Sequence, residues 1–163
     1  MKALLLALTL TFSIQVVNAD TITGKVVGVA DGDTITVLDQ NNTQFKIRLA
    51  GIDAPEKKQA FGNVAKKSLS DLVFDKQVTV DWKKQDRYGR TVGKVLIDGR
   101  DINLKQIKLG MAWYYKKYQN ELVLDDRLAY LHAQEAAENG KTGLWIDYEP
   151  IAPWDFRKKR KSE

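Results

Sequence analysis

The chain has 163 residues, of which 44% are hydrophobic and 29% charged, and its formal net charge is +5 at pH 7. This length and composition fit one globular domain and exclude an intrinsically disordered chain. The absence of cysteine excludes disulfides, thiolate metal sites and a cysteine nucleophile. The single histidine, His132, excludes a paired-histidine mechanism and a histidine-rich zinc site, and we expect it on or near a helix surface.

The N-terminal segment has the pattern of a secretory signal peptide. A short basic start precedes an apolar stretch, and the small residues of Val17-Asn18-Ala19 end it. A membrane anchor is the alternative, but the uninterrupted apolar run is too short to span a bilayer. We therefore predict that residues 1–19 are removed, that the mature chain begins at Asp20, and that the protein is secreted or periplasmic.

Three strands are expected in the first part of the mature chain. Residues 21–29 are rich in β-branched side chains and end at an Asp-Gly-Asp turn, after which residues 33–38 form a second strand. Apolar residues alternate with other residues through 45–49. This period of two directs the apolar side chains to the core and places Arg48 on the opposite face.

A helix and two further strands follow. Residues 60–74 have the periodicity of a helix, and residues 77–82 and 91–97 have the composition of strands joined by a polar turn. The remainder is predicted to be helical, with a short helix over 103–109 and a longer one over 122–137.

The longer helix carries Leu124, Leu128 and Leu131 at a spacing that predicts one buried face. Five strands, with one helix between the third and fourth and others after the fifth, indicate a mainly β protein with about three helices (α+β). The predicted architecture is a five-stranded OB-type barrel.

The positive charge is not spread evenly along the chain. Residues 20–156 contain 20 Lys and Arg against 20 Asp and Glu, so the folded body is neutral. The excess lies in an unbroken basic run over 157–161. We predict one folded domain over 20–150, followed by a basic tail over 151–163. The tail is expected to be solvated and disordered, and to attract phosphates at long range.

Three short polar clusters are candidates for a functional site. They are Asp31-Gly32-Asp33-Thr34, the segment from Arg48 to Glu56, and Asp86-Arg87-Tyr88-Gly89-Arg90. The hairpin between the second and third strands puts the start of one beside the end of the other, so Asp33 and Asp53 are expected to lie close together. Two carboxylates with carbonyl oxygens and water suit Ca²⁺ or Mg²⁺. The alternative is that these aspartates only cap turns.

These clusters resemble the motifs of the staphylococcal nuclease (thermonuclease) family. Asp-Gly-Asp-Thr, an arginine followed by Asp-x-Pro-Glu, and Tyr-Gly-Arg stand in the family's order at compatible distances. The resemblance extends from about Thr23 to Trp145 and includes the segment Gly110-Met111-Ala112-Trp113. It implies calcium-dependent hydrolysis of phosphodiester bonds in DNA and RNA, with 3′-phosphate products. It also implies a preference for single or frayed strands.

The resemblance assigns a role to residues of each cluster. The calcium ligands that it implies are the side chains of Asp33 and Asp53 and the backbone carbonyl of Ala54, with Asp31 in support. The catalytic residues that it implies are Arg48, Glu56 and Arg90. The residues that it implies for substrate binding are Arg87, Tyr88 and Tyr118.

The same residue types suit phosphodiester hydrolysis on physical grounds. Glu56 can accept a proton from water as a general base. Arg48 and Arg90 offer planar, permanently charged donors that match phosphate oxygens, and calcium adds Lewis-acid stabilisation. Because the pKa of arginine is above about 12, neither guanidinium is a good acid for the leaving oxygen.

The chain departs from the family pattern in three places. Ala54 replaces a threonine of the best-known member, which a carbonyl ligand tolerates. The segment after Glu56 is shorter than in that member. Tyr118 matches one tyrosine of the base pocket, whereas Lys116 lies where the other would be, so base preference does not transfer.

Two other functions fit parts of the pattern. A non-catalytic nucleic-acid-binding OB-fold module is the first alternative, but such relatives would lack one or more of the five central residues, all present here: Asp33, Arg48, Asp53, Glu56 and Arg90. A secreted calcium-binding or adhesion domain is the second, and it has no use for paired arginines. We therefore expect an exported, monomeric, calcium-dependent endonuclease without stable membrane association.

Overall fold

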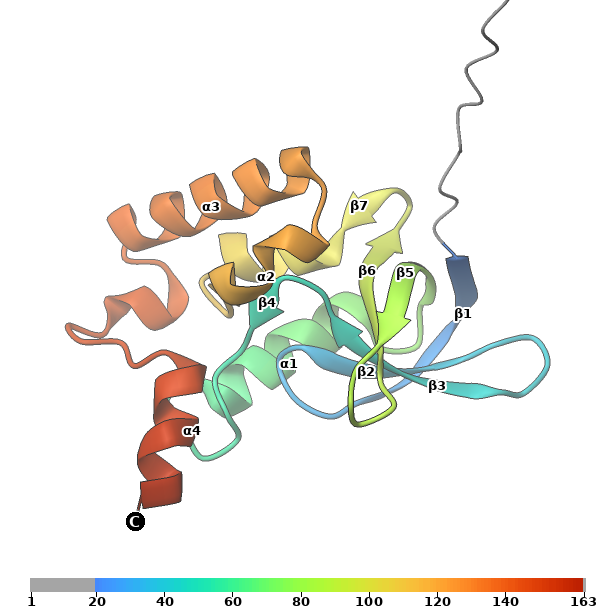
Figure 1. Cartoon of the computed structure of the whole chain (residues 1–163), viewed down its shortest axis with the longest axis horizontal. Helices are drawn as coiled ribbons and strands as arrows, with labels where there is room; N and C mark the ends of the chain where they lie inside the picture. The colour runs from blue at the N-terminus through green and yellow to red at the C-terminus, as the bar shows by residue number, and fades with distance from the viewer. Residues whose placement is uncertain (1–19, 163) are drawn as a thin grey trace, which may run out of the picture.

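The computed structural model describes residues 20–162, and its centre is a closed barrel of five strands (Figure 1). The barrel strands are β1 (Asp20–Val29), β2 (Thr34–Leu38), β3 (Gln44–Leu49), β5 (Gln77–Gln85) and β6 (Thr91–Ile97). All five were expected from the sequence, each within a few residues of its observed bounds. The predicted OB-type barrel of an α+β protein is confirmed.

The barrel closes where β3 meets β6. Neighbouring strands in the order β3-β2-β1-β5-β6 are antiparallel, and β3 then pairs with β6 in parallel, with Leu49 opposite Gly93. Asn103, which is fully buried, holds this seam. Its Nδ2 donates to the carbonyl oxygens of Ala50 and Gly93 at 3.0 and 3.2 Å, and its Oδ1 accepts from the amide of Val95. One side chain therefore satisfies backbone groups on both sides of the closure.

The barrel interior is filled by the alternate, inward-pointing residues of its strands. The fully buried members include Val26, Ile35, Val37, Ile47, Leu49, Val80 and Val95. The alternation predicted for β3 holds, because Ile47 and Leu49 are buried while Phe45 packs against the core at its edge. β-branched residues dominate this core because they pack well on a pleated surface.

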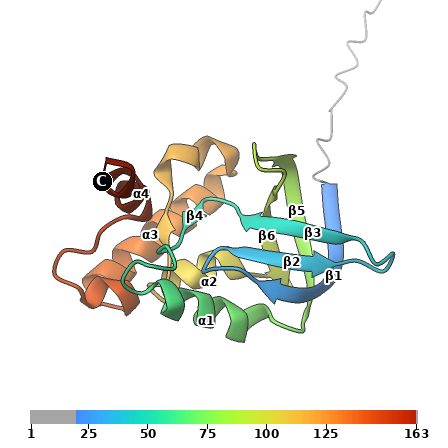
Figure 2. The same ribbon diagram turned by 90° about the horizontal axis from the view of Figure 1, so that it is seen from below.

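Four α-helices and two 3₁₀ helices complete the described chain. They are α1 (Gly62–Val73), α2 (Ile102–Lys108), η1 (Lys116–Glu121), α3 (Leu124–Asn139), η2 (Gly143–Ile146) and α4 (Pro153–Ser162). Figure 2 shows the helices gathered at one end of the strands. Helix α2 lies between β6 and α3 and contacts both. Three short strands, β4 (Ile52–Asp53), β7 (Arg100–Asp101) and β8 (Trp113–Tyr114), connect these parts.

The prediction of the buried face of α3 was wrong for two of its three leucines, since only Leu131 packs against the core. Leu124 and Leu128 are 64% and 46% exposed, whereas Tyr130, Ala133 and Ala137 are buried. The hydroxyl of Tyr130 donates to Asp101 Oδ2 at 2.8 Å, so its ring enters the core with its polar end satisfied. Small alanines let the helix approach α2 closely. The spacing of the leucines does not show that the alanine face is the buried one. His132 is exposed on the same helix, as expected.

The prediction of a disordered tail was also wrong. Residues 153–162 form helix α4, which begins with Pro153 as its first residue, a position that proline favours. Ala152 and Pro153 are buried, and Trp154 stacks on Tyr115. The basic run over 157–161 made this helix look like a solvated tail, because the apolar residues that pack it against the rest of the protein precede the run. The sequence prediction of about three helices therefore omits α4.

The predicted signal peptide, residues 1–19, lies outside the described residues and stays a prediction. Within 20–162, none of the helices combines the length and the apolar character needed to cross a bilayer.

Candidate active site

The Asp-Gly-Asp turn between β1 and β2 is packed against two other segments. A Cβ atom at Gly32 would lie 2.7 Å from the Cβ atoms of both Ala54 and Ala65, so only glycine permits this approach. The buried amide of Gln106 donates from Nε2 to the carbonyl oxygens of Gly32 and Ala65 at 2.9 and 3.2 Å. The turn is thereby fixed to α1 and to the loop after β4. Sequence reasoning missed Gln106. The one signal that could have found it is its position one helical turn after Asn103.

The backbone of three strands brings the acidic residues together. Thr34 is paired with Arg48 across β2 and β3, and the amide of Leu49 donates to the carbonyl oxygen of Asp33 at 2.8 Å. Strand β4 then pairs with β8, with Asp53 opposite Trp113. The start of β2, the end of β3 and β4 therefore meet at one end of the barrel.

Asp33 and Asp53 share one arginine in this region, so the predicted proximity of the two aspartates is confirmed. Arg48 Nη2 lies 3.3 Å from Asp33 Oδ2 and 3.0 Å from Asp53 Oδ1. Asp33 Oδ2 also accepts from the amide of Ala54 at 2.7 Å, and Asp31 Oδ1 accepts from the amide of Asp33. Asp33 and Asp53 are both buried. Asp31 thus supports the turn that presents Asp33.

The buried carboxylate of Asp33 lacks full charge compensation from the protein. Burial raises its pKa to about 7 from an ordinary value of 3.8, although the charge of Arg48 opposes this rise. A divalent cation would stabilise the ionised carboxylate. The donor set fits a hard cation, because Asp33, Asp53 and the carbonyl of Ala54 all offer oxygen. In the part of the chain described here, no three His, Asp or Glu side chains surround a common point, so water or substrate oxygens would complete the coordination.

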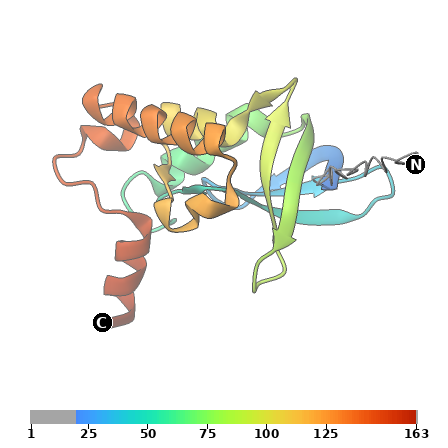
Figure 3. The ribbon, with the colours of Figure 1, turned by 45° about the horizontal axis from the view of Figure 1, so that its top comes forward.

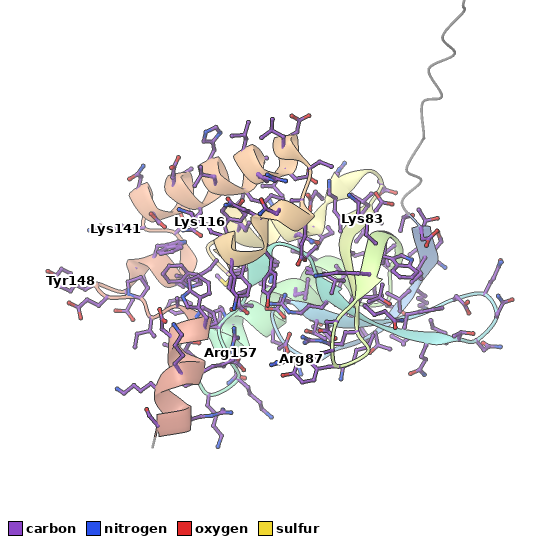
Figure 4. All side chains as sticks on the ribbon, viewed as in Figure 1. Lys83, Arg87, Lys116, Lys141, Tyr148 and Arg157 are labelled. Carbon is purple, nitrogen blue, oxygen red and sulfur yellow. The ribbon has the colours of Figure 1, made fainter. Side chains whose placement is uncertain are left out.

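Glu56 follows β4 and is linked to Asp53 by Arg157, a residue of the C-terminal helix α4 that contacts both side chains. Arg157 Nη1 lies 2.7 Å from Glu56 Oε1 and 3.2 Å from Asp53 Oδ1, and its Nη2 lies 2.6 Å from Asp53 Oδ2. Burial alone would lower the pKa of Arg157, but its hydrogen bonds to Asp53 and Glu56 raise that pKa above its ordinary value. Figure 4 labels Arg157 where α4 faces the body of the molecule. Sequence reasoning placed this residue in a solvated tail and missed the contact.

The turn between β5 and β6 carries the third cluster, which is held together by contacts within the turn. Asp86 Oδ1 accepts from the amides of Tyr88 and Arg90, and Asp86 Oδ2 lies 2.8 and 2.7 Å from Nε and Nη2 of Arg90. Burial acts to raise the pKa of Asp86, but these hydrogen bonds outweigh it and lower that pKa below its ordinary value. Within residues 20–162, the ion pair of Arg90 is with Asp86 and not with Asp33, Asp53 or Glu56.

The tip of that turn presents an exposed aromatic ring between two arginines. The guanidinium carbons of Arg87 and Arg90 lie 4.8 and 5.5 Å from the ring centre of Tyr88, and Arg87 Nη2 donates to the Tyr88 hydroxyl at 2.7 Å. Figures 1 and 3 show that the β5–β6 turn and α4 extend from the same side of the barrel. The two substrate-binding candidates of this cluster are therefore accessible on the side that carries α4.

A row of aromatic rings leads from the core to the third substrate-binding candidate, Tyr118. Trp113 contacts Trp145 and Trp154 edge-on, at 4.3 and 5.6 Å between ring centres. Trp154 lies flat on Tyr115 at 5.0 Å with an interplanar angle of 4°, and Tyr115 meets Tyr118 edge-on at 4.9 Å. Tyr118 is at the exposed end of the row. The row starts beside Asp53, which is paired with Trp113.

Comparison with known proteins links this arrangement to nucleases. A model of the family described as staphylococcal nuclease homologue matches residues 46–147. An "Uncharacterized endonuclease" of Haemophilus influenzae is 45% identical over 161 residues, which cover 98% of this chain and 87% of the relative. Another of that name, from Escherichia coli, is 42% identical over 91% of this chain and 93% of its own length. The "Micrococcal nuclease" of Shigella flexneri is 40% identical over 85% and 82% of the two chains.

Proposed function

Because the chain belongs to the staphylococcal nuclease family and is a nuclease, we propose that it is an exported, calcium-dependent endonuclease acting on DNA and RNA. The observation that carries this proposal is the shared contact of Arg48 with the buried carboxylates of Asp33 and Asp53. A phosphate-binding guanidinium next to two hard oxygen ligands suits a cation and a phosphodiester at the same place.

Asp33, Asp53 and the carbonyl oxygen of Ala54 would hold the calcium ion. Asp31 supports this set through its hydrogen bond to the amide of Asp33. When bound, calcium supplies Lewis-acid stabilisation to the phosphate. The raised pKa of Asp33 supports the assignment, since a cation would offset the cost of burying its charge.

The hydrolytic step itself falls to Glu56 and the two arginines. Glu56 takes a proton from water while the water oxygen bonds to phosphorus, and the bond from phosphorus to the 5′-oxygen breaks. The 5′-oxygen then takes up a proton, and the product keeps a 3′-phosphate. Arg48 and Arg90 stabilise the charge that develops on the phosphate oxygens, with Asp86 orienting Arg90.

The surface around this site suits unpaired strands. Tyr88 and Tyr118 are exposed rings on which unstacked bases can lie, and Arg87 is placed to meet a phosphate beside Tyr88. A duplex hides its base faces, so we propose that single or frayed strands are preferred. We further propose a monomer without stable membrane association. The export proposal rests on the N-terminal sequence pattern alone.

One experiment tests this function directly. The mature chain is incubated with plasmid DNA, single-stranded DNA and total RNA, each with calcium or with a chelator. We expect cleavage of all three that depends on calcium and is fastest on single strands. The 3′ ends should block a polymerase until a phosphatase removes their phosphate. Binding of these nucleic acids without cleavage would instead favour the non-catalytic OB-fold module.

A further inference from the structure

The C-terminal helix α4 lies over the carboxylates that the proposed function requires. Arg157 contacts both oxygens of Asp53, and one of its nitrogens also contacts Glu56. Asp53 is one proposed cation ligand, and Glu56 is the proposed base. A single side chain of α4 thus occupies hydrogen-bonding positions on a ligand and on the base.

Arg157 and a divalent cation need the same oxygens of Asp53. A guanidinium binds a carboxylate through two parallel N–H groups, and this uses the lone pairs that a metal ion would accept. The second guanidinium on Asp53, that of Arg48, already contacts Oδ1. With both arginines in place, the carboxylate has little capacity left for a cation. Arg157 must move away from Asp53 before that ligand is free.

Trp154 covers an aromatic surface next to the same site. Its ring lies on Tyr115 at 5.0 Å and nearly parallel, which is also the way a nucleobase stacks on a protein ring. Tyr115 in turn contacts Tyr118, the exposed ring that we assign to substrate binding. Helix α4 therefore covers a candidate base platform with Trp154 and the carboxylates with Arg157.

The attachment of α4 is suited to release. A helix of this length is marginal by itself in water, so its stability depends on these few contacts. The segment before it is largely exposed, with Ile146 71% and Tyr148 95% exposed, so release of α4 uncovers mainly the surface that Ala152, Pro153 and Trp154 bury. The side chains of Lys158, Lys159 and Arg160 are exposed, and a polyanionic strand would attract them.

We propose that α4 is an autoinhibitory helix. In its docked position Arg157 excludes a divalent cation from Asp53, and Trp154 excludes a base from Tyr115. Binding of the cation and of a nucleic-acid strand displaces it. The proposal rests on the proposed function, since it takes Asp53 and Glu56 to be parts of the nuclease site.

Calcium binding to the full mature chain, measured by calorimetry without nucleic acid, tests the competition. Arg157→Gln removes the competing guanidinium, and Arg160→Gln removes the same charge from an exposed position of the same helix. We expect the Kd for calcium to fall about tenfold in Arg157→Gln if α4 is docked nine-tenths of the time, and to stay unchanged in Arg160→Gln. Trp154→Ala should lower the Kd by a smaller factor, because it weakens docking but retains Arg157.

Limited trypsin digestion gives an independent measurement. Calcium should accelerate cleavage within α4 of the wild-type protein, because the displaced helix exposes its basic residues to the protease. Slower cleavage with calcium, or a weaker calcium affinity in Arg157→Gln, would overturn the proposal and show instead that Arg157 holds the carboxylates of Asp53 and Glu56 in place for the cation.

The two proposals fail in different ways. Calcium-dependent hydrolysis by the wild type, together with an unchanged Kd in Arg157→Gln, overturns only the autoinhibition. Tighter calcium binding in that variant without any hydrolysis leaves the competition intact and overturns the nuclease proposal.

Discussion

Arg48 and Asp53 form an ion pair at 3.0 Å in which the side chains are 14% and 2% exposed. Removing one partner of such a pair leaves a buried charge, which usually costs about 3 to 5 kcal/mol. Arg157 also contacts Asp53 and would reduce this cost. The pair therefore links the stability of the site to its chemistry.

The first prediction separates these two roles with a conservative change. Arg48→Lys keeps the charge but loses the planar guanidinium that contacts both aspartates and that we propose binds a phosphate. We expect the fold to persist, with a melting temperature lowered by a few degrees at most, and turnover to fall on the order of a hundredfold. Lys46→Arg on the same strand is the control and should change neither. Turnover near that of the wild type would exclude a catalytic role for the Arg48 fork.

The second prediction concerns the proposed base. Glu56→Gln keeps the shape of the side chain and removes its ability to take a proton, so turnover should fall on the order of 10² or more. Affinity for a single-stranded oligonucleotide should persist, because the arginines remain. Glu135→Gln, an exposed position on α3, is the matched control. Steady-state kinetics and fluorescence anisotropy measure the two quantities, and unchanged turnover would remove Glu56 from the mechanism.

The third prediction concerns the turn that holds Arg90. Arg90→Lys should lower turnover severely, since a point charge cannot reproduce the bidentate donor. Asp86→Asn leaves Arg90 present but weakens the contacts that orient it, so we expect a smaller loss, about tenfold. Arg87→Gln should act mainly on KM, because Arg87 lies at the exposed tip. A kcat effect of Arg87→Gln as large as that of Arg90→Lys would contradict this division.

The fourth prediction is a pH dependence of stability without divalent cations. The pKa of Asp33 is raised to about 7 in the folded protein from 3.8, mainly by burial, so the folded state holds the proton more tightly than the unfolded chain. The stabilisation by this proton is complete below pH 4 and is lost as the pH rises through 7. The free energy of unfolding should therefore fall between pH 4 and 7, by at most about 1.4 kcal/mol per pH unit. In Asp33→Asn this contribution should vanish, which urea denaturation across the pH range would measure.

The fifth prediction concerns the support of the Asp-Gly-Asp turn. Gln106→Leu leaves the carbonyl oxygens of Gly32 and Ala65 without the donor that they share. Each buried unsatisfied group costs about 1 to 3 kcal/mol, so the free energy of unfolding should fall by about 2 to 4 kcal/mol. Calcium affinity should fall as well, because the turn presents Asp33. A variant as stable as the wild type would show that other contacts fix the turn.

Much of the barrel was predictable because local signals and tertiary packing agree there. The alternation of β3 and the turn residues around Gly32 and Gly89 gave both the strands and the positions of the polar clusters. The proximity of Asp33 and Asp53 followed from one hairpin, which needs no long-range information. Local patterns of this kind are the most reliable part of a sequence reading.

The parts that could not be predicted depend on contacts between distant segments. Gln106 supports the site from 74 residues away in sequence, and Arg157 reaches Asp53 across 104 residues. No local pattern distinguishes such an arginine from its neighbours in a charge run. The buried face of α3 was missed for a similar reason, since its partner surface is made by α2 and β8.

The parallel pairing of β3 with β6 determines when, during synthesis of the chain, the site can form. The loop with Asp53 and Glu56 is fixed only after β6 and Asn103 close the barrel, and β8 must still pair with β4. Contacts between segments so far apart form late in folding. A growing chain that has not yet reached Trp113 therefore lacks the assembled carboxylates. The cell that makes this protein would thus be shielded from its nuclease activity for most of translation.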